Sequence, residues 1–360
     1  MISVISTPNI AFTKYWGNRN ENLRLPANDS LSMTLDSPTV RISIEPAETF
    51  SVRSWNVDGS EKTLSEKNIA RFHCHRELVN RYLATLQTEV SIIQPSPRLS
   101  KKSLRGAGWS ISNYQLSIRS QIPSAIGLAS SAAVFSGVAK AYGELLRREG
   151  LELTDEQISI IARLGSGSAC RSIQGGFVAI DAGIGDTIDS AKAVQIADND
   201  HWPLHDIVIA PSLEEKKVGS TEGHRFAHTS PCYAERLRQM SRRQRECINA
   251  IRTRDFEKLQ RVSEKDALDL HKVAETSNPP LQYLNQETHR IIGEIETLRK
   301  EEHLAVLFTM DAGPTVHLVC TEESRDRIAR YAHNQPHCTV FETKVGSGAH
   351  CQHASTSTLS

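Results

Sequence analysis

The sequence predicts an α+β fold built from two halves of similar size. Strand-like and helical patterns are mixed in the first half, whereas three helical segments follow one another near 232–252, 254–275 and 280–302. Helices grouped in this way are typical of α+β folds and not of a doubly wound sheet, in which strands and helices alternate. The chain has 360 residues, which is enough for two ordinary domains.

A soft boundary near 185–205 divides the chain. We therefore expect an N-terminal domain over 1–190 and a C-terminal domain over 191–345. The last residues, 346–360, are rich in Ser, Thr and His and lack apolar periodicity. This composition predicts a disordered tail.

The first domain shows strand and helix periodicities in turn. Apolar and polar residues alternate over 40–60 and reach an Asp-Gly turn at Asp58, which predicts hairpin strands. The remaining patterns predict a helix over 65–86, a basic Pro/Gly/Ser-rich loop over 94–108, a strand over 109–121, helices over 130–149 and from Thr154 as N-cap, and a strand over 175–183.

The second domain begins with an apolar strand over 204–212, and the three helical segments come next. Two short apolar runs, LAVLF (304–308) and VHLVC (316–320), have the length of buried strands and enclose a bend. A helix near 325–333 and a strand around CTVFET (338–343) complete the predicted elements.

The composition is that of a globular chain without charge bias. Lys plus Arg and Asp plus Glu number 42 each, which argues against a protein that mainly coats nucleic acid. No apolar run approaches the length of a membrane span, and the start MISVISTPNI has neither a basic n-region nor an apolar h-region. Seven scattered cysteines without a CxxC pair suit a reducing compartment. We expect a cytoplasmic protein with no membrane or nucleic-acid partner.

A glycine-containing loop leads into a serine-rich helix start in PSAIGLASSAAVFSGVAKAYGELL (123–146). Ser130 and Ser131 fall in the first helical turn, where free backbone N–H groups and the helix dipole favour anions. Small residues let a polyphosphate approach the backbone, and the hydroxyls can add hydrogen bonds or a metal contact. The alternative is an ordinary Ser-capped helix. Neither a P-loop nor a strand-linked GxGxxG is present.

Three further segments combine polar groups with small or aromatic residues. GSGSACRSIQGG (165–176) places hydroxyls beside Arg171, whose fork suits a carboxylate or phosphate; the alternative is a surface arginine in a salt bridge. KYWGNR (14–19) crowds polar and aromatic groups into six positions, either as a binding segment or as a loop whose aromatics pack. GSTEGH (219–224) is a short Gly/Ser/Thr turn with an equally weak signal.

Asp311 lies in TMDAGPTVH (309–317), in the bend between the two apolar runs. Carboxylates are rarely placed against a core without a partner or a purpose. Asp311 is therefore a candidate catalytic group, and the alternative is a capping Asp in a strand–turn–strand bend.

Together these motifs resemble the mevalonate diphosphate decarboxylase and phosphomevalonate decarboxylase family of the GHMP kinase superfamily. The matching segments, from about Pro8 to about Cys320, are KYWG, LPANDSLSMTLD, PSAIGLASSAA, GSGSACRSIQGGF, STEG and MDAGP. The resemblance implies an N-terminal ribosomal-S5-domain-2-like half and a C-terminal ferredoxin-like half, with the active site in the cleft between them. It also implies a homodimer in the cytosol.

Enzymes of this family use ATP and Mg²⁺ to phosphorylate the tertiary 3-hydroxyl of a 5-phosphorylated mevalonate, in the mevalonate pathway of isoprenoid biosynthesis. Phosphate and CO₂ then leave, and an isopentenyl product forms. A tertiary hydroxyl is a poor leaving group, so it must first become a phosphate ester. Loss of that ester builds positive charge at C3, which a nearby carboxylate stabilises.

The resemblance also implies roles for residues at matching positions. Asp311 is expected to orient or deprotonate the 3-hydroxyl, Lys14 to lie near the reacting end and Arg171 to bind the C1 carboxylate. The other substrate-binding residues implied are Tyr15, Trp16, Asn18, Arg71, Ser166, Gly167, Ser168, Ser220 and His224. The ATP-binding residues implied are Ser120, Gly127, Leu128, Ala129, Ser130 and Ser131, with Ser131 also as a metal ligand.

Several positions depart from the family's pattern. The family's KYWGK reads KYWGN here, so Asn18 replaces a lysine that usually reaches the 5-diphosphate. SSTxGM reads GSTEGH, which introduces Gly219 and His224, and a usual Asn before the serine loop is Ser120. Losing the lysine costs a charge-assisted bond of about 1.5–3 kcal/mol unless Arg19 or His224 compensates. These changes slightly favour mevalonate 5-phosphate as substrate, with isopentenyl phosphate as product; the alternative is mevalonate 5-diphosphate.

Two other functions stay open from the sequence. A kinase that phosphorylates a mevalonate hydroxyl and stops is disfavoured, because Asp311, Arg171 and Lys14 are all retained. An inactive nucleotide-binding regulator would need a broken serine loop or a missing Asp, and neither is seen. CO₂ release separates a decarboxylase from the kinase, and ATP turnover separates both from a regulator.

Overall fold

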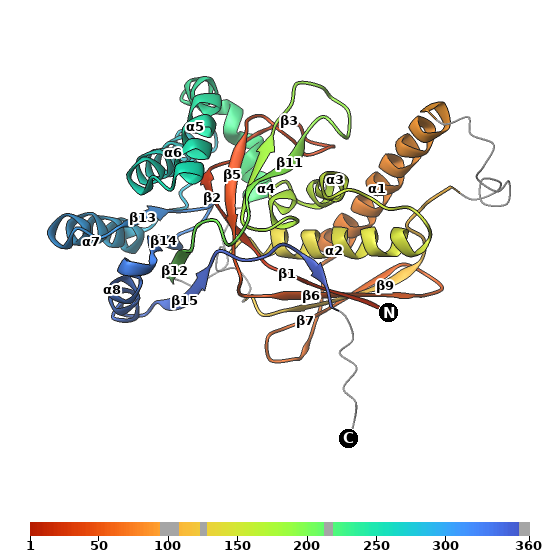
Figure 1. Cartoon of the computed structure of the whole chain (residues 1–360), viewed down its shortest axis with the longest axis horizontal. Coiled ribbons are helices and arrows are strands. Elements are labelled where there is room, and N and C mark those ends of the chain that lie inside the picture. Colours follow the sequence, from red (N-terminus) through yellow and green to blue (C-terminus); the bar gives the residue numbers. More distant parts are fainter. Residues whose placement is uncertain (94–107, 123–127, 212–218, 353–360) are drawn as a thin grey trace.

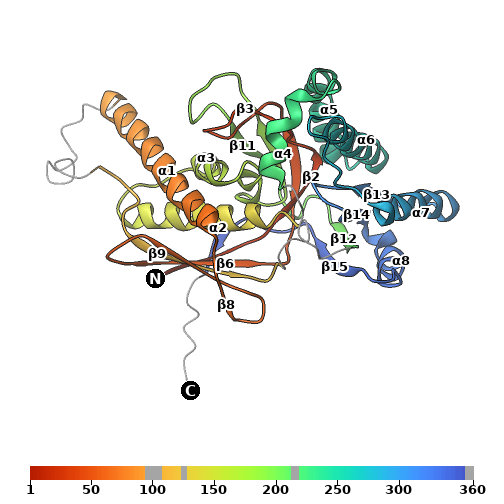
Figure 2. The ribbon, with the colours of Figure 1, turned by 180° about the vertical axis from the view of Figure 1, so that it is seen from behind.

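The computed structural model describes residues 1–93, 108–122, 128–211 and 219–352. Helices and mainly antiparallel sheets are combined in both halves, and the helices of the C-terminal half are grouped (Figure 1, Figure 2). The prediction of an α+β fold is therefore confirmed. Most of the predicted basic loop lies outside the described residues.

The first sheet carries the N-terminal half. Its six strands have the order β16-β1-β6-β9-β7-β8. Their bounds are β1 (Ile2–Ser6), β6 (Val40–Pro46), β7 (Ser51–Trp55), β8 (Glu61–Lys62), β9 (Tyr114–Ser120) and β16 (His350–Cys351). Buried and less buried residues alternate along β1, as expected when one face of an antiparallel sheet packs on a core.

Helices α1 (Glu66–Ile93), α2 (Ser130–Arg148) and α3 (Asp155–Gly165) lie on one side of this sheet (Figure 1). Thr154 caps α3 through a capping box with Gln157, as the sequence predicted for this N-cap. The apolar side chains between the helices and the sheet form the largest core cluster of the described chain. These three helices fix the position of the serine-rich helix start.

The predicted hairpin over 40–60 is only partly correct. The Asp-Gly turn at Asp58 does join β7 to β8. However, β9 lies between β6 and β7 and runs parallel to β7, so β6 and β7 are not paired with each other. Alternation along a strand shows that one face is buried, but it does not identify the neighbouring strand.

The second sheet joins the two halves. Its order is β11-β10-β5-β2, with bounds β2 (Asn9–Thr13), β5 (Ser30–Thr34), β10 (Phe177–Asp181) and β11 (Lys192–Ala197). Every residue of β2 and β5 is buried. One core cluster contains Phe12 and Leu31 from this sheet together with Ile251 and Leu259 from two later helices. Strand β11 pairs with β10 although it follows residue 190.

The third sheet and four helices make up most of the C-terminal half. The strand order is β13-β14-β12-β15, with bounds β12 (Leu204–Ala210), β13 (Val306–Thr309), β14 (Val316–Thr321) and β15 (Thr339–Lys344). The helices are α5 (Tyr233–Thr253), α6 (Phe256–Glu275), α7 (Gln286–Glu302) and α8 (Glu322–His333). The three predicted consecutive helices are therefore confirmed as α5, α6 and α7. None of the helices in the described ranges is long and apolar enough to cross a membrane.

Short elements complete the fold around the cleft. They are β3 (Asn18–Asn20), β4 (Leu25–Pro26), α4 (Ser220–Phe226) and two 3₁₀ helices, η1 (Ala169–Ser172) and η2 (Ala227–Thr229). The GSTEGH segment, expected to be a turn, thus forms helix α4.

The predicted disordered tail differs from the structure over 346–352. Strand β16 pairs with β1, and Ala349 is buried. Glycines allow this close packing: a Cβ at Gly346 would lie 2.5 Å from the backbone nitrogen of Asp36. A segment rich in small residues and without periodicity can still be fixed by backbone contacts. Residues 353–360 lie outside the described ranges.

Candidate active site

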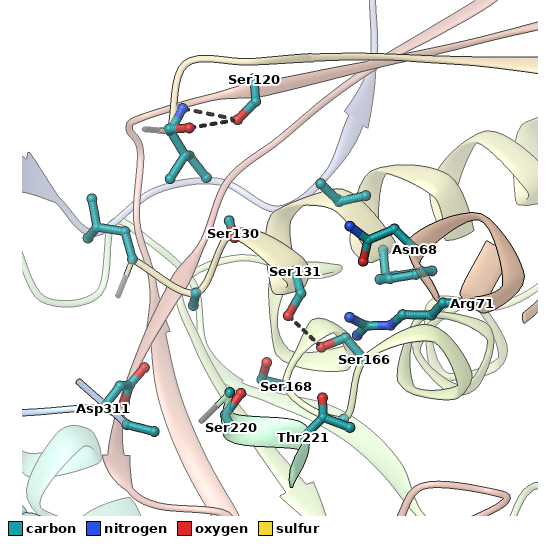
Figure 3. Close-up of a pocket in the computed structure, with 18 of the residues that line it drawn as sticks. Asn68, Arg71, Ser120, Ser130, Ser131, Ser166, Ser168, Ser220, Thr221 and Asp311 are labelled. Carbon is teal, nitrogen blue, oxygen red and sulfur yellow. Dashed lines mark hydrogen bonds between the residues drawn. The ribbon is translucent and has the colours of Figure 1, made fainter. Parts of the chain in front are cut away.

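A cavity of about 780 Å³ opens between the two halves (Figure 3). The start of α2, helix α1, the β7–β8 hairpin and the loop before η1 line it from the N-terminal half, and α4 and the bend after β13 line it from the other. The predicted site residues that line it are Lys14, Tyr15, Trp16, Asn18, Arg71, Ser120, Leu128, Ala129, Ser130, Ser131, Ser166, Gly167, Ser168, Arg171, Ser220, His224 and Asp311. Gly127 lies outside the described residues.

An ion pair connects the two halves inside this cavity. Lys14 follows strand β2, and its Nζ lies 2.8 Å from Oδ1 of Asp311, in the bend after β13. The lysine side chain is 2% exposed and the aspartate side chain 30% exposed. Asp311 therefore presents its carboxylate to the cavity, while Lys14 fixes it from behind. This is a fitting arrangement for a carboxylate that acts on a bound hydroxyl.

The backbone of Lys14 is held by a buried charged network. Its N–H donates to Oδ2 of Asp266 (2.6 Å), and its carbonyl accepts from Nη2 of Arg236 (3.0 Å) and Nδ2 of Asn28 (3.0 Å). Arg236 and Arg243 both pair with Asp266. A buried carboxylate needs such partners, because water is absent there. The network places Lys14 with its ammonium towards Asp311.

Arg171 lies in η1 and is 3% exposed. Its guanidinium donates to the hydroxyls of Ser32 and, at 2.6 Å, of Ser30, and more weakly to Oδ1 of Asn9 (3.5 Å). Burial lowers the pKa of Arg171, while the charge of Asp311 opposes this shift. All three acceptors are neutral. The guanidinium is thus oriented without its charge being neutralised, which suits it to bind an anion.

The GSGS segment supplies hydroxyls and a close backbone approach. The Oγ atoms of Ser131 and Ser166 lie 3.1 Å apart, which links the start of α2 to the end of α3 (Figure 3). A Cβ at Gly167 would lie 2.4 Å from the ring of Tyr15, so this position has no room for a side chain. The glycine lets Tyr15 pack directly on the segment.

Aromatic rings hold the KYWGN segment in place. The His224 ring stacks on Tyr15 at a centroid distance of 4.3 Å and packs on Trp16 at 4.6 Å. Nδ1 of His224 accepts a hydrogen bond from the N–H of Gly17 (2.9 Å). The hydroxyl of Tyr15 donates to Oδ1 of Asn18.

Neither residue expected to replace the missing lysine does so. Burial, followed by the charges of Arg24 and Arg171, lowers the pKa of His224 to about 3, so the ring is neutral at physiological pH. The guanidinium of Arg19 donates to the carbonyls of Pro26 (3.1 Å) and Gly185 (2.6 Å). Arg19 is not among the residues that line the cavity.

The start of α2 has the features of an anion site. Its N-cap, Ala129, has φ of 36° and offers no side-chain acceptor to the first turn. Ser130 and Ser131 open the helix beside the cavity (Figure 3). The N–H groups of such a turn and the helix dipole attract phosphate. The left-handed conformation of an alanine costs energy, and strain of this kind is frequent at functional sites.

Ser120 has a different role from its neighbours across the cavity. Its Oγ accepts from the N–H of Ile122 (3.0 Å) and shapes the turn after β9 (Figure 3).

The described residues contain no group of three or more His, Cys, Asp or Glu side chains that could hold a metal. Mg²⁺ is often bound through substrate phosphates with few protein ligands. The Ser131 hydroxyl, next to the expected phosphate position, fits that mode.

Several residues around the cavity escaped the sequence analysis. Arg24 and Asn68 line it, and Asp266 and Arg236 support Lys14. Asp266 carried a detectable signal, because it falls on the same face of its helix as the apolar residues of the core. Arg24 directly precedes the matching segment LPANDSLSMTLD, where a basic residue between two leucines was the available signal.

Comparisons with known proteins agree on one group. Residues 6–192 match the model of a diphosphomevalonate decarboxylase-like N-terminal domain, and residues 207–357 match that of the mevalonate 5-diphosphate decarboxylase C-terminal domain. The diphosphomevalonate decarboxylase of Candida albicans is 34% identical over 333 residues, which are 91% of this chain and 86% of the relative.

Solved structures show the same likeness. A structure of MDDEF in complex with MVAPP, AMPPCP and magnesium has a TM-score of 0.81 and 26% identity, and the match covers 98% of both chains. The mevalonate diphosphate decarboxylase of Staphylococcus aureus has a TM-score of 0.80 and 26% identity, over 98% of this chain and 99% of that one.

Proposed function

Because the chain belongs to the diphosphomevalonate decarboxylase family, we propose that it catalyses the ATP-dependent decarboxylation of mevalonate 5-diphosphate. The chain has the GHMP kinase fold and is an ATP-dependent carboxy-lyase. The proposed reaction converts ATP and mevalonate 5-diphosphate to ADP, phosphate, CO₂ and isopentenyl diphosphate.

The arrangement of Lys14, Asp311 and Arg171 carries this proposal. The ion pair of Lys14 and Asp311 lines the same cavity as Arg171, whose guanidinium is bound to neutral groups. The start of α2 lines that cavity too. A hydroxyl, a carboxylate and a nucleotide polyphosphate thus have separate and suitable partners within one cavity.

The first step transfers the terminal phosphoryl group of ATP to the 3-hydroxyl. Asp311 orients this hydroxyl and accepts its proton as the new O–P bond forms. Lys14 holds the Asp311 carboxylate in position through the 2.8 Å contact. Backbone N–H groups at the start of α2 bind the ATP phosphates, and a Mg²⁺ ion held by those phosphates and the Ser131 hydroxyl would neutralise part of their charge.

The second step breaks two bonds of the phosphorylated intermediate. The C3–O bond breaks, and its electrons leave with phosphate. The electrons of the C1–C2 bond form the new C2=C3 double bond, and C1 leaves as CO₂. Asp311 first releases the proton it accepted to solvent, and the negative charge of its restored carboxylate then stabilises the positive charge that builds at C3. Arg171 binds the C1 carboxylate until this group becomes neutral CO₂. The hydroxyls of Ser30 and Ser32 continue to accept hydrogen bonds from the Arg171 guanidinium afterwards.

The choice of mevalonate 5-diphosphate corrects the preference drawn from the sequence. The curated relative and the family models are named for the diphosphate, which supports the alternative and not the slightly favoured 5-phosphate. The loss of a lysine at Asn18 suggested a weaker anion site. The structure, however, places Arg24 and Arg71 along the same cavity, so positive charge is retained.

The location and the assembly rest on the resemblance. We infer a cytoplasmic homodimer, because members of the family that the sequence resembles usually form homodimers in the cytosol. Sedimentation of the purified chain with and without ligands tests it, because a dimer has twice the monomer mass of 40.0 kDa.

The test of the proposed function is release of ADP and CO₂ from ATP, Mg²⁺ and each of the two mevalonates in parallel. We expect a higher kcat/KM with mevalonate 5-diphosphate, with one CO₂ per ADP. A preference for mevalonate 5-phosphate would overturn the choice of substrate. ADP release without CO₂ would identify a kinase, and no ATP turnover would leave only a nucleotide-binding protein.

A further inference from the structure

Two arginines meet at the C-terminal end of helix α3. Nε of Arg24 donates to the carbonyl of Leu164 (3.1 Å). Nε and Nη2 of Arg71 donate to the carbonyl of Gly165 (3.1 and 2.8 Å). Leu164 and Gly165 are the last residues of α3, and carbonyls at a helix C-terminus lack partners within the helix. Both guanidinium groups are therefore anchored side by side on one helix end.

The two arginines have no acidic partner within the described residues. Other buried arginines, such as Arg236 and Arg243, pair with carboxylates. Arg163 is satisfied differently, because its guanidinium donates to three carbonyls and it does not line the cavity. Arg24 and Arg71 do line the cavity, and each is anchored on a single carbonyl. Both therefore retain N–H groups for a ligand.

The charge of Arg24 also disfavours the charged form of Arg71. Burial, and then the charge of Arg24, lowers the pKa of Arg71 to about 9. The Arg71 guanidinium stacks on the ring of Phe135, 4.6 Å from its centroid, which fixes its direction. It points towards the hydroxyls of Ser131 and Ser166 (Figure 3). Two adjacent cations without a counter-charge are stabilised by an anion placed between them.

Arg24 lies close to the residues expected to hold the 5-phosphate end of the substrate. Burial raises the pKa of Tyr15, and the charge of Arg24 is the largest effect that opposes this shift. The side chain of Asn18, in contrast, carries no charge and is already engaged. It accepts from Tyr15 and donates to Oε1 of Glu21 (3.0 Å). Arg24 lines the same cavity as Tyr15 and lies in the turn that joins β3, the strand that begins with Asn18, to β4, so it supplies the cation on this side.

We propose that Arg24, together with Arg71, binds the terminal phosphate of the substrate's 5-diphosphate and so determines the preference for a diphosphate over a monophosphate. This inference rests on the proposed function. A guanidinium fork offers two parallel N–H donors to a phosphate, whereas a lysine offers a point charge. In the family, the cation is a lysine at the position of Asn18 in β3. In this chain, the cation is Arg24 in the turn before β4.

The test replaces Arg24 by glutamine, which keeps an amide donor for the Leu164 carbonyl and removes the charge. For Arg24→Gln we expect KM for mevalonate 5-diphosphate to rise about 10- to 100-fold, because a charge-assisted hydrogen bond is lost. KM for ATP and kcat should change by less than about threefold. The preference for diphosphate over monophosphate should shrink by the same factor as the affinity.

A charge-relocation variant gives the decisive comparison. The double variant Asn18→Lys/Arg24→Gln places a cation at position 18 in β3. Its KM for mevalonate 5-diphosphate should fall from that of Arg24→Gln most of the way back to the wild-type value. A merely structural role for Arg24 would not be rescued by a lysine at position 18. Arg225→Met is the matched control, because this exposed arginine pairs with Glu21 on the surface and does not line the cavity.

Binding separates this proposal from the proposed function. Calorimetric titration of mevalonate 5-diphosphate, without ATP, measures Kd for wild type and Arg24→Gln irrespective of turnover. Weaker binding to the variant supports the proposal even if wild type releases no CO₂. An unchanged Kd, a change confined to KM for ATP, or a failure of Asn18→Lys to rescue would overturn it. Unfolding midpoints of each variant show that the comparison is made between folded proteins.

Discussion

At the residue scale, the proposed reacting centre depends on one ion pair whose two members lie 297 positions apart in the chain. Lys14 is buried and holds the carboxylate of Asp311 in place, whereas Asp311 reaches the cavity and can contact a substrate there. Ion pairs of this type hold a carboxylate in one orientation more firmly than solvent can. Asp311 is therefore the residue whose removal should separate binding from chemistry.

For Asp311→Asn we expect CO₂ release to fall at least about 10²-fold, because general base catalysis and charge stabilisation at C3 are both lost. Binding of ATP and mevalonate 5-diphosphate should change only a few-fold, since the amide keeps the size of the carboxylate. Single-turnover CO₂ release and calorimetry measure the two effects. Turnover close to wild type would contradict the assigned role.

The control for this variant is Asp186→Asn, a change of the same kind on the exposed surface. Removing one partner of a partly buried pair also leaves Lys14 uncompensated, which lowers stability. The unfolding midpoint of Asp311→Asn should therefore be measured as well, and activity compared at a temperature where both variants are folded.

The sequence located many single residues of the cavity but not their electrostatic state. Asp311, Arg171 and Lys14 stood in recognisable motifs. His224 was considered as a replacement cation, yet its pKa depends on burial against two aromatic rings, which no local pattern shows. Arg24 was missed because its significance arises from having no acidic partner among the residues that the structure describes, which is a property of the folded chain.

At the element scale, helices were easier to predict than strand partners. Helices α2, α3, α5 and α6 follow from periodicity and caps, because those signals lie within the helix itself. The order of the first sheet does not follow in the same way, since β9 inserts between β6 and β7 from 60 residues further along. The same limit explains the segment 346–352, whose order comes entirely from contacts with distant backbone.

That segment supports the element that carries Arg171. The N–H of Gly346 donates to the carbonyl of Thr34 (2.8 Å), and the N–H of Ala349 donates to that of Ser172 (3.0 Å), the last residue of η1. The hydroxyl of Thr34 in turn donates to the carbonyl of Arg171 (2.9 Å). The end of the described chain is thus part of the support for the carboxylate site.

A chain that ends at Val345 should therefore be less stable and bind substrate less well. Each lost backbone hydrogen bond is worth about 0.5–1.5 kcal/mol, so we expect the unfolding midpoint to fall by at least several degrees and KM for mevalonate 5-diphosphate to rise. A chain that ends at Gln352 is the matched control, since it keeps these contacts. Equal midpoints for the two chains would show that the segment contributes nothing.

At the scale of the whole molecule, three histidines make stability depend on pH. Burial lowers the pKa of His224 and His271 to about 3 and that of His75 to about 4. In the unfolded chain their pKa returns to about 6.5. Between those values the unfolded state binds more protons than the folded state, so the free energy of unfolding falls as pH decreases.

We expect this loss to begin below about pH 6.5 and to reach about 1.4 kcal/mol per pH unit for each histidine at most. Urea unfolding at pH 7, 6 and 5 measures it. His224→Met should reduce the slope of the free energy of unfolding against pH, between pH 6 and 5, by up to the value for one proton, about 1.4 kcal/mol per pH unit. His228→Gln, at an exposed position, should leave this slope unchanged. An unchanged slope in His224→Met would contradict the assigned protonation state.

The sequence predicted a division into two halves, but it did not show how they are joined. A single core cluster takes side chains from the second sheet and from α5 and α6. Grouped helices suggested where the second half begins, whereas contacts between residues more than 200 positions apart follow from the folded chain alone.

The clamp on Lys14 has a consequence for the evolution of this enzyme as a single chain. Lys14 belongs to the N-terminal half. Asp266, which accepts from its backbone N–H, and Arg236, which donates to its carbonyl, belong to the C-terminal half. The proposed catalytic centre therefore also includes contacts that join the two halves. Neither half expressed alone should therefore be active. A mutation that weakens the contacts between the halves should also lower turnover, so selection for activity acts on these contacts.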